Sequence, residues 1–284
     1  MGELAGRVWP GAPARPSPAR WWWHRQLKKP FFGRFKQPWR WPAGVDAEGW
    51  SRVSIASGSH STLSAIVRET TRQRPLGVVV CAHPMGLAAK GFWLRNGHAD
   101  VLLDAGFHVL AFDFNGFGES PSTNFDWPAD AIAAGRFARA SFPGLPVHAL
   151  AASFGAMHVL NATPHPAFPY DRIVAEGVAP SLADFWKAYP VAHAVLAVST
   201  ALAPRVERAL RPEAALAAAH RPTRLLLIHS RGDDWTPVAH GERLQAASRG
   251  PVARLVLEWA EHTHGLRDEP FRWRHAVLGF LQAP

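Results

Sequence analysis

The sequence has very little cysteine and no long apolar segment. Cys81 is the single cysteine among 284 residues, so no disulfide can form within the chain, and a cytoplasmic, reducing location is expected. The longest apolar stretch, residues 191–203, is interrupted by His193 and is shorter than the roughly 18 residues that a membrane-spanning helix needs. The first 30 residues contain no continuous apolar core, so a secretory signal is not expected.

Acidic residues are scarce only at the start of the chain. Residues 1–45 hold nine Lys or Arg residues and a single acidic residue, Glu3, whereas the remainder holds 22 basic and 21 acidic residues. The N-terminal segment therefore carries +8 of the formal net charge of +9, and the remainder of the chain carries +1. A basic body that cradles phosphates is not supported by this distribution, and we expect no nucleic-acid partner.

Residues 1–45 are expected to form an extension, and residues 46–284 the folded domain. The extension is rich in Pro and Arg and holds six of the 13 tryptophans, without a steady apolar period. Trp mixed with cationic side chains suits the headgroup region of an anionic membrane, which predicts peripheral membrane contact through residues 1–45. The alternative is an extended arm whose aromatic side chains pack along the domain.

Beyond residue 50, strand patterns alternate with helical ones. Residues 53–67 show the alternation and central turn of a β-hairpin. Short apolar runs predict further strands at residues 76–82, 109–112, 147–151, 173–175, 224–228 and 255–258. Helical patterns begin near residues 92, 126 and 153, and the first of these ends at Gly106. The alternation predicts an α/β fold, with a mostly parallel sheet, helices on both faces and the hairpin at one edge.

A small helical cap is expected at about residues 180–219. This segment lies between two predicted strands and is longer than one crossover helix needs. It is rich in Ala and Leu, and three prolines divide it into short helical stretches. Its large apolar side chains are those of Phe185, Trp186, Tyr189, Val195, Leu196, Val198 and Leu202. They would either cover an apolar acyl substrate or hold the cap to the sheet.

The predicted strand at 147–151 leads directly into Ala151-Ala152-Ser153-Phe154-Gly155. Small residues on both sides of a serine at a strand-to-helix turn hold that serine in a strained backbone conformation, with its hydroxyl clear of the sheet. The helix that follows points its N–H groups at the same place. The pattern predicts a serine whose hydroxyl is exposed at the mouth of a site.

Five motifs, in this order along the chain, resemble those of the α/β-hydrolase superfamily. They are His83-Pro84-Met85-Gly86, the stretch from Asp113 to Ser120, the Ser153 turn, Ser230-Arg231-Gly232-Asp233 with Pro237, and the region of His262. Each follows a predicted strand, and the resemblance covers about residues 50–284. It implies the α/β-hydrolase fold and a serine hydrolase that cleaves an ester or related acyl bond of a small molecule through an acyl-enzyme. One departure is Ala151, which stands where the turn usually has glycine.

The resemblance also implies roles for single residues. Ser153 would be the nucleophile, His262 the base and Asp233 the acid that orients the histidine. Asp234 is an alternative acid and His264 an alternative base. We favour His262 because its distance from the last predicted strand matches the family's histidine.

Two backbone N–H groups would hold the oxyanion. One belongs to Phe154, which follows the nucleophile, and the family pattern places the other at Met85. Pro84 has no N–H to offer. His83 is expected to shape this loop rather than to take part directly.

Other functions fit parts of the same pattern. A non-catalytic binding or scaffold protein could keep the fold after losing the activity. An acyltransferase or a perhydrolase would use the same three side chains. The glycines after Asp113 match neither a phosphate loop nor a dinucleotide fingerprint, so we expect a tight turn there. No Cys and His set has metal-site spacing, and no cofactor is expected.

Overall fold

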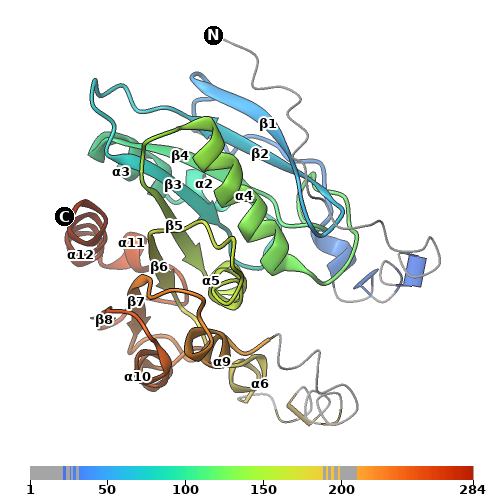
Figure 1. The fold of residues 1–284 in the computed structure, drawn as a ribbon, viewed down its shortest axis with the longest axis vertical. Helices are drawn as coiled ribbons and strands as arrows, with labels where there is room; N and C mark the ends of the chain where they lie inside the picture. The colour runs from blue at the N-terminus through green and yellow to red at the C-terminus, as the bar shows by residue number, and fades with distance from the viewer. Residues whose placement is uncertain are drawn as a thin grey trace. The chain divides into compact units, whose positions relative to one another are not determined.

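A computed structural model describes residues 22–23, 26, 28–29, 32–187, 190, 193–194, 198 and 210–283. The chain forms two compact units, Met1–Ala149 and Leu150–Pro284. The ribbon in Figure 1 shows strands and helices alternating along both units. This alternation agrees with the pattern that the sequence predicts.

The first unit contains the predicted hairpin and two strands that are buried throughout. β1 (Trp50–Ala56) and β2 (Thr62–Arg68) pair antiparallel, and β2 pairs antiparallel with β4 (Phe107–Phe112). β3 (Gly77–Ala82) runs parallel to β4. Every residue of β3 and β4 is buried, as expected of strands with both faces covered.

The named helices of the first unit differ in length, and the longest of them has a side-chain cap. They are α2 (Gly91–Arg95), α3 (His98–Ala105) and α4 (Trp127–Ser141), with a short 3-10 turn, η1, at Gly33–Phe35. Asp126 accepts a hydrogen bond from Ala129 N at 3.3 Å and so caps α4, as its position before Pro128 predicts. The single helix predicted from residue 92 is wrong. Gly97 takes φ +72° and divides it into α2 and α3, because a left-handed residue cannot continue an α-helix.

The second unit carries the remaining parallel strands. β5 (Val147–Ala152) begins in the first unit and ends in the second, where β6 (Arg172–Glu176), β7 (Arg224–Ser230) and β8 (Val252–Leu257) follow. β7 pairs parallel with both β6 and β8. The full strand order, β1-β2-β4-β3-β5-β6-β7-β8, is that of a mostly parallel sheet. The predicted α/β fold class is confirmed.

The last strand differs from the prediction in its bounds. β8 begins at Val252 rather than at 255, and most of its residues are only half-buried or exposed. Such an edge strand lacks the continuous apolar run that marks a buried one. The helices of this unit are α5 (Phe154–Asn161), α6 (Leu182–Phe185), α9 (Pro212–Ala217), α10 (Val238–Ala247), α11 (Gly265–Asp268) and α12 (Pro270–Gln282).

The predicted cap at 180–219 is described only in part. Its first and last portions form α6 and α9. Arg243 of α10 joins the two, with Nη1 2.9 Å from Asp184 Oδ1 and Nη2 2.6 Å from Glu213 Oε2. Of the apolar side chains named for the cap, those of Tyr189, Val195, Leu196 and Leu202 lie outside the described residues.

One lysine of the N-terminal extension is buried in the first unit. Lys28 is 1% exposed, and its Nζ donates hydrogen bonds to Asn115 O at 3.1 Å and to Asn124 O at 2.6 Å. The Trp127 ring lies 4.6 Å from the same atom. Burial lowers the pKa of Lys28 to about 7, although Asp130 acts in the opposite direction. This cation is therefore not available to a membrane surface.

Aromatic residues of the extension pack beside Lys28. Phe35 stacks on Phe117 with ring centroids 5.3 Å apart, and Phe32 lies 5.1 Å from Trp127. These contacts agree with the alternative in which aromatic side chains of the extension pack along the domain. Trp22 and Trp23 are exposed by 52% and 59%. Peripheral membrane contact stays a prediction. Among the described tryptophans of the extension, Trp22 and Trp23 are the exposed ones that could make it.

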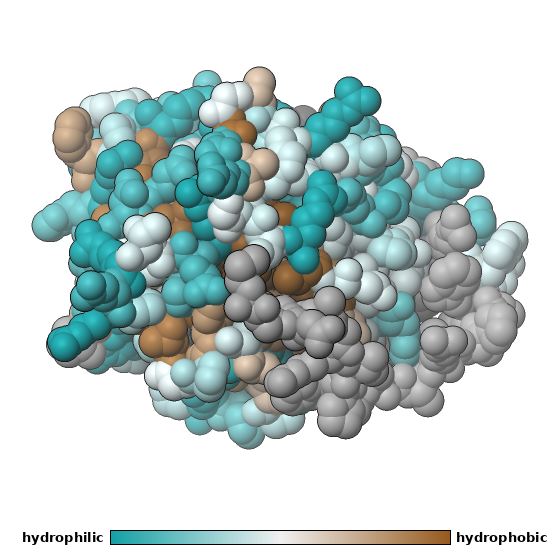
Figure 2. Space-filling model, turned by 90° about the horizontal axis from the view of Figure 1, so that it is seen from above, coloured by the Kyte–Doolittle hydropathy of each residue, from teal (hydrophilic) through white to brown (hydrophobic). Residues whose placement is uncertain are grey.

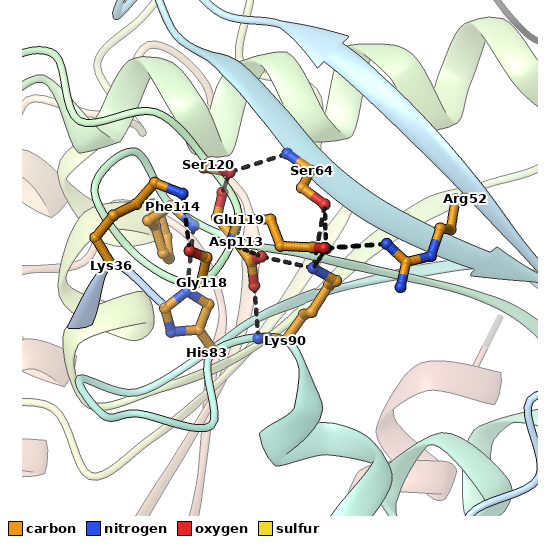
Figure 3. Close-up of polar contacts among 10 residues, drawn as sticks. All are labelled: Lys36, Arg52, Ser64, His83, Lys90, Asp113, Phe114, Gly118, Glu119 and Ser120. Carbon is orange, nitrogen blue, oxygen red and sulfur yellow. Dashed lines mark hydrogen bonds and ion pairs between the residues drawn. The ribbon is translucent and has the colours of Figure 1, made fainter. Parts of the chain in front are cut away.

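A buried ion pair joins two loops of the first unit (Figure 3). Lys90 Nζ lies 2.6 Å from Asp113 Oδ2, 2.9 Å from Glu119 Oε2 and 3.1 Å from Ser64 Oγ. Lys90 and Asp113 have fully buried side chains. Their contacts tie the loop after β3 to the turn after β4. The Asp113 region is thus a structural turn, as predicted from its glycines.

Replacing Lys90 with Met should destabilise the protein by about 3–5 kcal/mol, because it leaves Asp113 buried without its counter-ion. The measurement is the free energy of unfolding in urea. Arg52→Met is the matched control, since Arg52 pairs with Glu119 at 3.1 Å but is 56% exposed and should cost only about 0–1 kcal/mol. Equal losses in the two variants would contradict the importance of the buried pair.

Among the residues that are coloured in Figure 2, hydrophilic side chains predominate, and the apolar areas between them are small. Among the helices that the structure describes, none combines the length and the apolar character needed to cross a membrane. The described residues also contain no group of three or more His, Cys, Asp or Glu residues arranged to hold a metal ion.

Candidate active site

Ser153 lies at the turn between β5 and α5, in the second unit. Its backbone has φ +47° and ψ −111°, a region that L-residues rarely adopt. Its N–H donates a hydrogen bond to Glu176 O at 2.8 Å, which fixes the turn to the end of β6. Ala151 and Gly155 on either side are buried. This is the strained strand-to-helix turn that the sequence predicts.

The three residues predicted to work together lie in one hydrogen-bonded chain. His262 Nε2 is 2.9 Å from Ser153 Oγ, and His262 Nδ1 is 2.7 Å from Asp233 Oδ2. An ionised carboxylate only accepts hydrogen bonds, so Nδ1 carries the proton and donates it to Asp233. Nε2 is then left as an acceptor for the Ser153 hydroxyl. The arrangement can remove a proton from this serine.

Asp233 is held as an ionised acceptor. Its Oδ1 accepts the backbone N–H groups of Trp235 at 2.9 Å and Thr236 at 3.1 Å, and the Thr236 hydroxyl donates to Oδ2. Burial alone would raise the pKa of Asp233, but the hydrogen bonds from His262 and Thr236 outweigh it and lower the pKa to about 2. At neutral pH Asp233 is therefore ionised and accepts a hydrogen bond from His262 Nδ1 without taking its proton.

The two alternative residues take other positions. Asp234 is exposed. The His264 ring lies with Nδ1 2.8 Å from His262 O, so it donates to the backbone of its own loop. Of the two candidate histidines, the structure therefore brings His262 to Ser153.

Glu176, which was not predicted from the sequence, links the Ser153 turn to the loop that follows His262. Its Oε1 accepts Gly265 N–H at 2.8 Å, and its Oε2 accepts Trp273 Nε1–H at 2.9 Å. Burial raises the pKa of Glu176, partly offset by these hydrogen bonds. Because its carbonyl also holds Ser153 N–H, one residue fixes both the serine turn and the loop that follows His262.

Gly177 makes room for the His262 ring. Its φ is +63°, and a Cβ at this position would lie 3.0 Å from His262 Cε1 and 3.1 Å from Nδ1. Any larger residue at this position would therefore press against the His262 ring. The sequence holds a signal for Glu176 and Gly177. A carboxylate followed by a glycine stands at the end of a predicted apolar strand.

The two residues predicted to hold an oxyanion belong to different units. Phe154 is the first residue of α5, whereas Met85 lies in the loop after β3. That loop is shaped by His83, whose Nε2 accepts Phe114 N–H at 3.2 Å, so that Nδ1–H donates to Pro84 O at 2.8 Å. Burial lowers the pKa of His83 and keeps it neutral. The loop-shaping interpretation of His83 is confirmed, and the oxyanion roles stay predictions.

Comparisons with known proteins identify the family of this chain. Residues 73–226, more than half of the chain, match the family described as "Serine aminopeptidase, S33". The uncharacterised protein YqkD of Bacillus subtilis is 39% identical over 57 residues, a match that covers 20% of this chain and 19% of that protein.

Solved structures share the fold. The esterase Pf2001 of Pyrococcus furiosus has a TM-score of 0.66 and 18% identity, covering 87% of this chain and 95% of its own. The esterase domain of a Rhodothermus marinus protein has a TM-score of 0.57 and 21% identity, covering 82% and 96%. At such identities the likeness establishes the fold, and the family match establishes a hydrolase. The chain belongs to the serine aminopeptidase S33 family of α/β hydrolases.

Proposed function

We propose that this hydrolase is a serine esterase that cleaves a carboxylic ester through an acyl-enzyme intermediate. The observation that carries the proposal is the hydrogen-bonded chain from Ser153 through His262 to Asp233, with contacts of 2.9 and 2.7 Å. A serine hydroxyl is a weak nucleophile at neutral pH, and this arrangement supplies the adjacent base that it needs.

In the first half of the reaction, Ser153 Oγ attacks the acyl carbon while its proton moves to His262 Nε2. Negative charge develops on the former carbonyl oxygen, and the N–H groups of Phe154 and Met85 are the proposed donors to it. Asp233 stabilises the imidazolium. The tetrahedral intermediate collapses, the C–O bond to the alcohol breaks, and His262 gives its proton to the departing oxygen.

In the second half, water replaces the alcohol. His262 Nε2 takes one proton from the water as its oxygen attacks the acyl-Ser153 carbon. Collapse of the second tetrahedral intermediate breaks the bond to Ser153 Oγ, and His262 returns the proton to that oxygen. The carboxylic acid leaves, and the enzyme is restored.

The choice of an ester over an amide follows the structural neighbours. The Pyrococcus furiosus and Rhodothermus marinus proteins are both described as esterases, whereas the family description refers to a peptidase. The same three side chains serve either bond, and an alkoxide or phenoxide departs more readily than an amide nitrogen.

The test is hydrolysis of p-nitrophenyl butyrate by the purified full chain, compared with its Ser153→Ala variant. A serine esterase turns the ester over and loses this activity with the hydroxyl. A non-catalytic scaffold protein shows no turnover in either form. An acyltransferase is distinguished by adding an acceptor alcohol, which then appears in the product as a new ester at the expense of the free acid.

A further inference from the structure

Three aromatic rings from two separate segments meet beside the base. Phe185 and Trp186 lie at the end of α6, and Trp235 lies in the loop that carries Asp233. Phe185 stacks on Trp235 with centroids 5.2 Å apart and an interplanar angle of 23°. Trp186 meets Trp235 edge-on at 6.2 Å and Phe185 at 5.5 Å. We call Phe185, Trp186 and Trp235 the aromatic wall.

Both segments of the aromatic wall are anchored. Asp184, the neighbour of Phe185, accepts hydrogen bonds from Ser181 Oγ at 2.6 Å and from Arg243 at 2.9 Å. The backbone of Trp235 is held by Asp233. All three rings are half-buried, so each keeps part of its surface for a ligand. A rigid, partly exposed aromatic surface binds a flat apolar group with little loss of its own conformational entropy.

The position of Phe185 indicates that the aromatic wall lies on the leaving-group side of the substrate. Its ring centroid lies 6.0 Å from that of His262. In the proposed reaction, His262 delivers its proton to the departing oxygen, so the leaving group must lie next to the imidazole when the bond breaks. Side chains packed against that imidazole therefore contact the leaving group before they contact the far end of the acyl chain.

We infer that the aromatic wall binds the leaving group and selects esters of aryl or arylmethyl alcohols. This inference rests on the proposed esterase function. A ring in the leaving group would stack on or meet Phe185 edge-on, the geometries in which aromatic pairs gain beyond simple burial of area.

The test compares two esters that share an acyl group and have alcohols of similar acidity, benzyl butyrate and methyl butyrate. Phe185→Ala should lower kcat/KM for benzyl butyrate by about tenfold, because the stacking and burial of one ring are lost. Its effect on methyl butyrate should stay below about twofold, since methanol does not reach the wall. Phe271→Ala, which removes a ring that is 88% exposed on α12, is the matched control and should change neither.

Two further substrates sharpen the outcome. Cyclohexylmethyl butyrate should be a poorer substrate than benzyl butyrate for the native chain, and equal rates would overturn the aromatic preference. If Phe185→Ala lowers methyl phenylacetate hydrolysis as much as that of benzyl butyrate, the wall lines the acyl side and the assignment is wrong. Equal losses for benzyl and methyl butyrate would make Phe185 a support for His262 instead.

The inference can fail separately from the proposed function. If the native chain hydrolyses neither ester, the esterase proposal itself is contradicted. If Phe185→Ala does not fold, Phe185→Leu keeps an apolar side chain of similar volume and should still lower the benzyl-to-methyl ratio of kcat/KM. An unchanged ratio in that variant overturns the inference.

Discussion

Replacing Ser153 with alanine should lower kcat for p-nitrophenyl butyrate by about 10⁶-fold, the order of loss found when the nucleophile of such a trio is removed. The reason is that, in the proposed mechanism, His262 and Asp233 act only through the Ser153 oxygen. Without it, the base has no hydroxyl to activate, and the acyl-enzyme cannot form. The measurement is initial rate at saturating substrate, with the unfolding midpoint recorded for both proteins.

The fold should survive this change. The Ser153 side chain makes its described hydrogen bond to His262 alone, and alanine fits where serine stood. Ser248→Ala is the matched control, because the Ser248 hydroxyl also donates a hydrogen bond, to Gly250 O at 3.2 Å, yet lies outside the relay. Turnover near the native rate in Ser153→Ala, or a comparable loss in Ser248→Ala, would contradict the assignment.

Replacing Asp233 with asparagine should lower kcat by about 10⁴-fold, because the wrong imidazole tautomer is then favoured. The amide NH₂ would donate to His262 Nδ1, so that Nε2 carries the proton and cannot accept one from Ser153. The variant also removes Oδ2 as the acceptor of the Thr236 hydroxyl, whereas Oδ1 still accepts the Trp235 and Thr236 N–H groups. The measurement is kcat across the pH range, which separates a lost tautomer from a shifted pH optimum.

The neighbouring acid gives a matched control for this variant. Asp234→Asn makes the same chemical change one residue away, on an exposed side chain, and should alter kcat by less than about twofold. If Asp234→Asn is the more damaging substitution, the acid has been assigned to the wrong residue.

Much of the fold could be predicted because its strands are buried. β3 has a continuous apolar run, and β4 has one that only His108 interrupts, and such runs are typical of strands covered on both faces. The Ser153 turn could be predicted as well, since small residues on both sides of a serine between a strand and a helix are typical of this strained turn. The choice between His262 and His264 depended on position in the last loop, and the structure brings His262 to Ser153 at 2.9 Å.

The rest depended on contacts between residues far apart in the chain. Glu176 joins Gly265 and Trp273 through its carboxylate, and no local pattern pairs a strand end with residues about 90 positions later. Lys28 appears in the sequence as one cation of a basic tail, yet it is buried among carbonyl groups and aromatic rings. Long-range partners of this kind are set by tertiary packing rather than by local propensity.

The measurement that tests the central claim most directly is covalent labelling with a fluorophosphonate, followed by peptide mapping. Only a serine with an adjacent base reacts rapidly with such a reagent. We predict a single adduct on the peptide that contains Ser153, formed rapidly by the native chain and very slowly by Asp233→Asn. An unlabelled native chain, or an adduct on another serine such as Ser181, would contradict the account.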